Sequence, residues 1–183
     1  MDFELSDEQN LVRETIRDFM RREFPRERVR QLDEAGAFPE REFLKQMGEL
    51  GFLGLPFSSR YGGSDGTPLD GTILMEEMGR VTTAAAAAYN HAAGFGARAI
   101  YLNGTEEQKQ RFLPRVCRGE VVFALGLTEP NAGSDARSLT TTARAQGDSF
   151  VINGAKMFTS GAGTADYIML AARTDPAAPS GKG

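Results

Sequence analysis

The fold is decided by residues 121–135, which read VVFALGLTEPNAGSD. The first part is a short apolar run bounded by turn residues, which is typical of a buried strand. The second part, TEPNAGSD, combines proline, glycine and short polar side chains, so it predicts a rigid turn at the end of that strand. Such a turn places backbone amides and two hydroxyl groups at a sheet rim, where small residues let a planar heterocycle approach the main chain. Taken alone, the same residues also fit an ordinary polar loop with an Asx or Ser turn.

The preceding residues, 1–119, carry mainly helix signals. Ser6 is followed three residues later by Gln9, and Thr105 is followed in the same way by Gln108. Both pairs have the spacing of a capping box, in which two side chains satisfy backbone groups at the start of a helix. We therefore expect an N-terminal, all-α helical domain.

Residues 120–183 have the shorter period of strands. Alternation across 139–145 predicts a half-exposed strand, and 167–172 reads as another. Asn153 and Gly154 lie between two apolar segments and predict a two-residue hairpin turn. The polar tail offers no closing strand, so we expect an incomplete antiparallel β-barrel-like domain and a piece of a longer chain. The predicted fold class is α+β.

Composition narrows the function classes. The chain has 183 residues and a formal net charge of −4, which argues against a nucleic-acid partner. Its apolar runs are far shorter than the roughly 20 residues that cross a bilayer, and its acidic start, MDFELSDEQ, has no apolar signal core. One Cys and one His cannot build a usual zinc site. We expect a cytoplasmic protein without a metal or a membrane partner.

TEPNAGSD at residues 128–135 resembles the TEPxAGSD signature of the acyl-CoA dehydrogenase family. Further stretches resemble the same family in the same order: SDEQNLVRETIRDF, MGELGFLGLPFSSRYGG, GTEEQKQRFLPRVCRGE, and INGAKMFTSGA followed by ADY. Together they cover nearly the whole chain. The resemblance implies a helical domain, a middle β-barrel-like domain, and FAD in a cleft between that barrel and a C-terminal helical domain that is missing here.

The resemblance also implies a set of flavin contacts. Main-chain groups of two leucines and the Thr128 side chain are expected along the isoalloxazine edge, and Ser134 near a flavin phosphate or the CoA moiety. Phe158 stands where the family commonly has Trp and is expected to cover one face of the ring; alone, it also reads as a hairpin core residue. Donors at that edge suit a flavin that gains negative charge when it accepts hydride. The predicted flavin-binding residues are Leu125, Leu127, Thr128, Gly133, Ser134, Phe158, Thr159 and Ser160.

The resemblance also suggests residues that contact the substrate. The resemblance makes Tyr89, His91 and Phe95 candidates for shaping the acyl pocket, and Ser134 a candidate for contacting the substrate. His91 alone reads as a hydrogen-bonded or surface histidine. Glu76 and Glu77 are expected on a solvated helix face. Glu129 is expected to hold its loop by accepting amide hydrogen bonds.

The implied activity is α,β-dehydrogenation of an acyl-CoA thioester to the trans-2-enoyl-CoA, with electrons passing to an electron-transferring flavoprotein. This chemistry requires a general base for the α proton. In the family that glutamate belongs to the C-terminal domain, so no catalytic residue is assigned here. Two alternatives stay open: a related acyl-CoA oxidase or flavin-dependent monooxygenase, and a non-catalytic fragment that retains the fold. The full-length protein is expected to form a homodimer or homotetramer.

Overall fold

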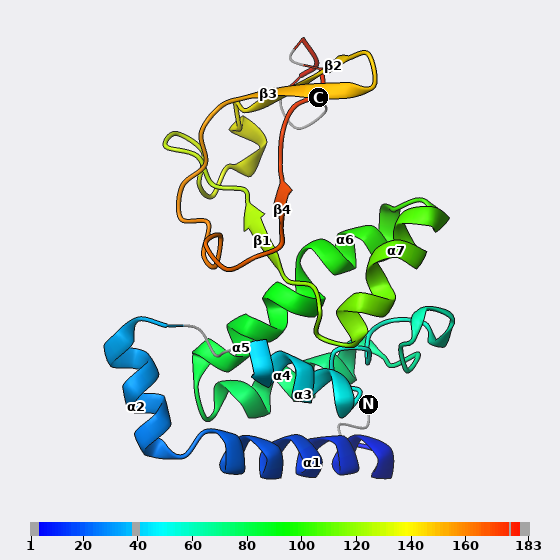
Figure 1. Ribbon diagram of the computed structural model, residues 1–183, viewed down its shortest axis with the longest axis vertical. Coiled ribbons are helices and arrows are strands. Elements are labelled where there is room, and N and C mark those ends of the chain that lie inside the picture. Colours follow the sequence, from blue (N-terminus) through cyan, green and yellow to red (C-terminus); the bar gives the residue numbers. More distant parts are fainter. Residues whose placement is uncertain (1–3, 38–40, 176, 180–183) are drawn as a thin grey trace. The chain divides into compact units, whose positions relative to one another are not determined.

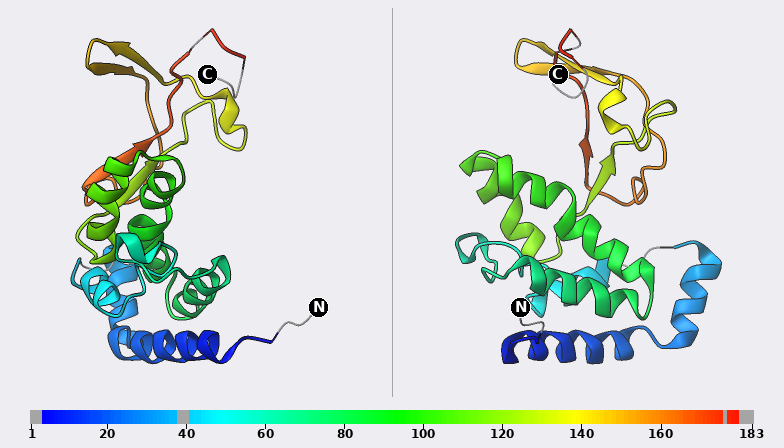
Figure 2. Two further views of the ribbon diagram at one scale, coloured as in Figure 1. Left: turned by 90° about the vertical axis from the view of Figure 1, so that its right-hand side faces the viewer. Right: turned by 180° about the vertical axis from the view of Figure 1, so that it is seen from behind.

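The computed structural model describes residues 4–37, 41–175 and 177–179. The chain divides between Val122 and Phe123 into two compact parts, a helical unit and a β unit (Figures 1 and 2). The predicted α+β class, with helices first and strands second, is confirmed. Within the described ranges, no helix is both long and apolar enough to span a membrane.

Helices form the first unit (Figure 1). The predicted capping boxes are confirmed: Ser6 and Gln9 exchange hydrogen bonds of 3.1 and 3.2 Å, and Thr105 and Gln108 exchange bonds of 2.9 and 3.2 Å. These bonds satisfy amides that a helix start otherwise leaves without partners. The helices in the described residues are α1 (Asp7–Glu23), α2 (Arg26–Ala35), α3 (Arg41–Glu49), α4 (Pro68–Gly79), α5 (Thr83–Tyr89), α6 (Gly96–Asn103) and α7 (Glu106–Cys117), with a 3₁₀ turn η1 (Ser59–Tyr61) and a π-helical turn η2 (Asn90–Gly94).

An ion pair joins α1 to α4 beside the buried core. The Arg17 guanidinium donates two hydrogen bonds to the Glu77 carboxylate, at 2.9 and 2.6 Å. Glu77 is 4% exposed, so the prediction of a solvated face is wrong for this residue, whereas Glu76 is exposed. The hydrogen bond from Arg17 outweighs burial and lowers the pKa of Glu77. The core beneath includes Ile16, Met20, Met47, Leu74, Met78, Leu113 and Val116.

The β unit contains two separate strand pairs in its described residues. The first pair is β1 (Phe123–Gly126) and β4 (Tyr167–Leu170), which run parallel. The second is β2 (Thr142–Gln146) and β3 (Ser149–Asn153), which run antiparallel (Figure 2). The expectation of antiparallel pairing is therefore wrong for β1 and β4, and no barrel closes within the described residues.

The hairpin turn lies at Gly147 and Asp148, not at the predicted Asn153 and Gly154. Gln146 pairs with Ser149, and Gly147 has φ 61°, which glycine adopts without steric cost. Gly154 follows the far end of the hairpin and has φ 152°. A Cβ atom there would lie 2.4 Å from Thr141 Oγ1, so close approach to the neighbouring chain explains this glycine.

Candidate functional site

A tight turn follows the end of β1, as the sequence predicts. Glu129 and Ala132 exchange two backbone hydrogen bonds, N to O, of 2.9 and 3.2 Å. Ala132 is buried, while Gly133 and Ser134 are exposed. A Cβ atom added to Gly133 would meet nothing within 4 Å. The turn therefore leaves Gly133 and Ser134 exposed, with open space beside Gly133.

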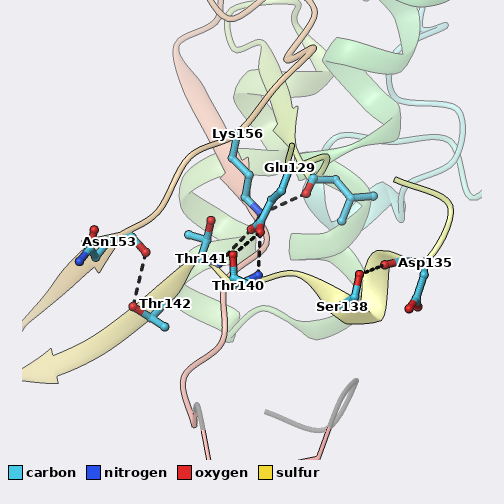
Figure 3. A network of polar contacts seen from close by, with 9 residues as sticks. Glu129, Asp135, Ser138, Thr140, Thr141, Thr142, Asn153 and Lys156 are labelled. Atoms are coloured by element: carbon cyan, nitrogen blue, oxygen red, sulfur yellow. Dashed lines mark hydrogen bonds and ion pairs between the residues drawn. The ribbon is translucent and has the colours of Figure 1, made fainter. Parts of the chain in front are cut away.

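A buried ion pair holds this turn in place (Figure 3). Glu129 Oε1 accepts hydrogen bonds from Lys156 Nζ at 2.8 Å and from the Thr141 amide at 2.9 Å. Glu129 Oε2 accepts from the Thr140 amide at 2.7 Å and from the Thr140 hydroxyl at 2.8 Å. The two charged side chains are 3% and 9% exposed. The prediction that Glu129 holds its loop by accepting amide hydrogen bonds is confirmed.

The surroundings of Glu129 favour its charged form. Burial raises the pKa of this carboxyl group. The hydrogen bonds from Lys156 and from the amides of Thr140 and Thr141 lower that pKa, and together they outweigh burial. The pKa of Glu129 consequently lies well below its usual range. At neutral pH, the turn rests on a carboxylate with four hydrogen-bond donors around it.

Lys156 also connects the turn to a second segment. Its Nζ donates to the Leu127 carbonyl at 3.0 Å, and the next residue, Met157, donates its amide to the Thr128 carbonyl at 2.8 Å. These contacts hold the chain after residue 155 beside the end of β1 (Figure 3). We call residues 125–134 and 156–160 together the paired rim. Sequence reasoning missed Lys156, whose one signal is a lone charge between apolar residues in INGAKMF.

One edge of β1 in the paired rim has no partner strand in the described residues. The Gly126 carbonyl accepts the Ala171 amide at 3.0 Å on the β4 side. Because main-chain groups alternate along a strand, those of Leu125 and Leu127 point to the opposite edge. The Leu127 carbonyl is taken there by Lys156. The rim therefore carries main-chain donors and acceptors that no strand uses.

Phe158 is the most unusual residue of the paired rim. Its φ is 55°, which is rare for a residue other than glycine, and its side chain is 81% exposed. It lies outside the strands, so the reading as a hairpin core residue is wrong. Thr159 is half-buried and Ser160 exposed, and the Ser160 amide donates to the Phe158 carbonyl at 2.9 Å. An exposed aromatic ring on a strained backbone is typical of a ligand contact.

Of the four substrate candidates, Ser134 lies in the paired rim, and Tyr89, His91 and Phe95 lie in the helical unit. His91 is in η2, is 6% exposed, and meets the ring of Phe95 edge-on with centroids 5.2 Å apart. It is therefore buried and not a surface histidine. Tyr89 lines a cavity of about 370 Å³, but His91 and Phe95 are not among the described residues that line it. The structure thus does not bring all three to one cavity.

Two models of one protein family match the chain. The family model for the acyl-CoA dehydrogenase N-terminal domain matches residues 6–120, and the model for the middle domain of the same family matches residues 124–182. A probable acyl-CoA dehydrogenase of Bacillus subtilis, YngJ, is 41% identical over 174 residues, which cover 95% of this chain and 45% of the relative.

Solved structures of other proteins also resemble this chain, in sequence and in fold. The acyl-CoA dehydrogenase from Geobacillus kaustophilus is 33% identical with a TM-score of 0.87, covering 97% of this chain and 46% of that one. The FAD complex of PigA is 26% identical with a TM-score of 0.86, covering 96% and 46%. The chain thus spans about half the length of the relatives it matches. Because the first family model alone matches more than half of its residues, the chain belongs to the acyl-CoA dehydrogenase family.

Proposed function

We propose that the paired rim binds the isoalloxazine ring of FAD, in a protein that dehydrogenates an acyl-CoA thioester to the trans-2-enoyl-CoA. Main-chain groups of Leu125, the Leu127 amide and the half-buried Thr128 side chain supply polar contacts for a ring edge, while the Leu127 carbonyl accepts from Lys156. Gly133 leaves space for close approach, and Ser134 is an exposed hydroxyl for a phosphate of the flavin or of CoA. The residues present therefore fit a flavin.

Each segment of the rim has its own task in this proposal. Bound FAD supplies the hydride acceptor. Donors along β1 stabilise negative charge at the ring edge, and Thr159 and Ser160 approach the reactive edge from the other segment. Phe158 covers one face of the ring and excludes water. In the helical unit, His91 and Phe95 are the residues that we propose shape the acyl pocket. The general base for the α proton is assigned to no residue of this chain.

One observation carries the proposal. The Met157 amide donates to the Thr128 carbonyl at 2.8 Å, so the two segments that resemble flavin-binding motifs lie side by side. Phe158, which belongs to the second segment, is 81% exposed. The FAD complex of PigA, which shares the fold, supports the same cofactor. The family resemblance supports an electron-transferring flavoprotein as electron acceptor and a dimer or tetramer as the assembly.

A binding measurement tests the cofactor. We expect the full chain to bind FAD and quench its fluorescence, and Phe158→Ala to weaken that binding by about tenfold, or ~1.4 kcal/mol. Phe150→Ala is the matched control, because Phe150 is also an exposed phenylalanine, 63% exposed, but lies in β3 outside the rim. Equal loss of FAD affinity in both variants, or no binding by the parent chain, would refute the proposed site.

A second measurement tests the reaction. Anaerobic addition of an acyl-CoA to the full-length protein is expected to bleach the flavin absorbance, and electron-transferring flavoprotein to restore it. Rapid reoxidation by oxygen alone would instead identify an oxidase or monooxygenase of the same superfamily. A flavin that no acyl-CoA reduces would leave the fold without this activity.

A further inference from the structure

The helical unit contains a cavity that the proposed flavin site does not use. It has a volume of about 370 Å³ and is lined by residues of α4, α5, η2 and α6 and of the segment before α4. Pro56, Met75 and Ala93 give it apolar walls, while Tyr89, Asn90 and Arg98 add polar groups. Volumes of this size hold small organic molecules.

A π-helical turn and two glycines line this cavity. In η2 the Phe95 amide donates to the Asn90 carbonyl five residues earlier, at 2.9 Å, which widens the helix locally. A Cβ atom on Gly94 would lie 2.4 Å from Asn90 Oδ1, so a side chain there would require the Asn90 side chain to move. Gly71 faces the cavity from α4, and a Cβ atom there would lie 3.9 Å from the Tyr89 hydroxyl.

The polar groups of the cavity suit an anion. Arg98 is half-buried and makes no ion pair with any residue in the part of the chain that the structure describes. Tyr89 is 5% exposed, and its hydroxyl lies beside the cavity. Burial raises the pKa of Tyr89 to about 12 against the opposing charge of Arg98, so the hydroxyl stays a donor at neutral pH. No Asp or Glu lines the cavity.

We propose that this cavity binds a small aliphatic carboxylate, whose charged end meets Arg98 and the Tyr89 hydroxyl and whose chain packs on Met75 and Ala93. A guanidinium group matches a carboxylate with two parallel hydrogen bonds. A single cation and apolar walls fit a monoanion with a hydrocarbon tail better than a phosphate, which carries more charge. The site is separate from His91 and Phe95 and does not depend on the proposed flavin chemistry.

Hexanoate is the probe, and NMR titration of the ¹⁵N-labelled full chain is the measurement. We expect hexanoate to shift the amide signals of Gly71, Met75 and Gly94 in a saturable manner. Hexanamide has the same chain without the charge, so its dissociation constant should be at least about tenfold higher, corresponding to ~1.4 kcal/mol. Equal binding of the two probes would overturn the proposal, since Arg98 would then have no role.

Variants locate the site. Arg98→Gln should raise the dissociation constant of hexanoate at least about tenfold, and Arg98→Lys should restore part of the affinity. Arg111→Gln is the matched control, because Arg111 is exposed on α7 outside the cavity. Gly71→Leu should block binding by filling the cavity. Binding that survives Arg98→Gln, or shifts confined to other residues, would overturn the proposal. No step requires turnover, so a failure here is distinct from a failure of the flavin site.

Discussion

Replacing Lys156 by methionine removes the cation from the buried pair that holds the paired rim. Methionine keeps most of the side-chain volume, so the change is mainly electrostatic. Removing one partner of a buried ion pair costs about 3–5 kcal/mol, because the other charge stays buried. Glu129 retains three hydrogen bonds, from the amide and hydroxyl of Thr140 and the amide of Thr141. These bonds favour a cost at the lower end of that range. We expect the free energy of unfolding of the β unit to fall by about 3 kcal/mol.

Urea unfolding followed by circular dichroism measures this loss. Lys45→Met is the matched control, because Lys45 is 57% exposed and lies 3.9 Å from Glu42, so its loss should cost at most about 1 kcal/mol. Adding Glu129→Gln to Lys156→Met removes the stranded charge and should recover part of the stability. Similar losses for the two lysine variants would refute the reasoning, since burial would then make no difference.

The same pair predicts a pH dependence. The pKa of Glu129 is lower in the folded state than the ordinary 4.5. The contribution of the Glu129 carboxylate to stability is therefore present above pH 4.5 and is lost as the pH falls toward the folded-state pKa. In Lys156→Met the pKa of Glu129 should rise toward the ordinary value. The stability difference between parent and variant should therefore shrink below pH 4.5. A difference that is constant or grows in acid would contradict this assignment.

Three further predictions concern other residues. Glu77→Ala should lower the urea midpoint clearly more than Glu76→Ala, because only Glu77 is buried against Arg17; equal midpoints would contradict the ion pair. The Cys117 thiol is 6% exposed, and burial raises its pKa to about 11. Iodoacetamide should therefore alkylate this thiol slowly at neutral pH and much faster in urea. Equal rates would show that the thiol is accessible in the folded state. Gly154→Ala should lower the free energy of unfolding by about 1–3 kcal/mol, because the new Cβ atom would clash with Thr141. Gly133→Ala should cost little, because a Cβ atom there has no neighbour within 4 Å. The reverse order would count against the close approach of Gly154 to Thr141.

Local sequence signals predicted local structure well. The capping boxes at Ser6 and Thr105 depend on residues three positions apart, and both form. The turn after β1 and the amide-binding role of Glu129 were also predictable, because proline and short polar residues restrict the chain wherever it lies. The hairpin was misplaced because two glycine-containing pairs compete, and contact between Gly154 and Thr141 decides against the second.

Contacts between distant residues could not be predicted from these signals. Arg17 and Glu77 are 60 positions apart, so nothing near Glu77 indicates its burial. The parallel pairing of β1 with β4 likewise joins residues more than 40 positions apart. The site shows the same division: the motif TEPNAGSD marks one half of the paired rim, whereas Lys156, which fastens it to the other half, becomes visible only in the structure.

Phe158 allows stability and binding to be separated. Its backbone, at φ 55°, carries strain of about 1–3 kcal/mol, and its ring, 81% exposed, gains little from burial. Glycine adopts this conformation freely, although it is more flexible when unfolded, so Phe158→Gly should raise the free energy of unfolding by up to about 1 kcal/mol. The same variant should bind FAD more weakly. A loss of stability above about 1 kcal/mol would instead mean that the ring packs within the β unit, and an unchanged FAD affinity would mean that the strain serves some other purpose.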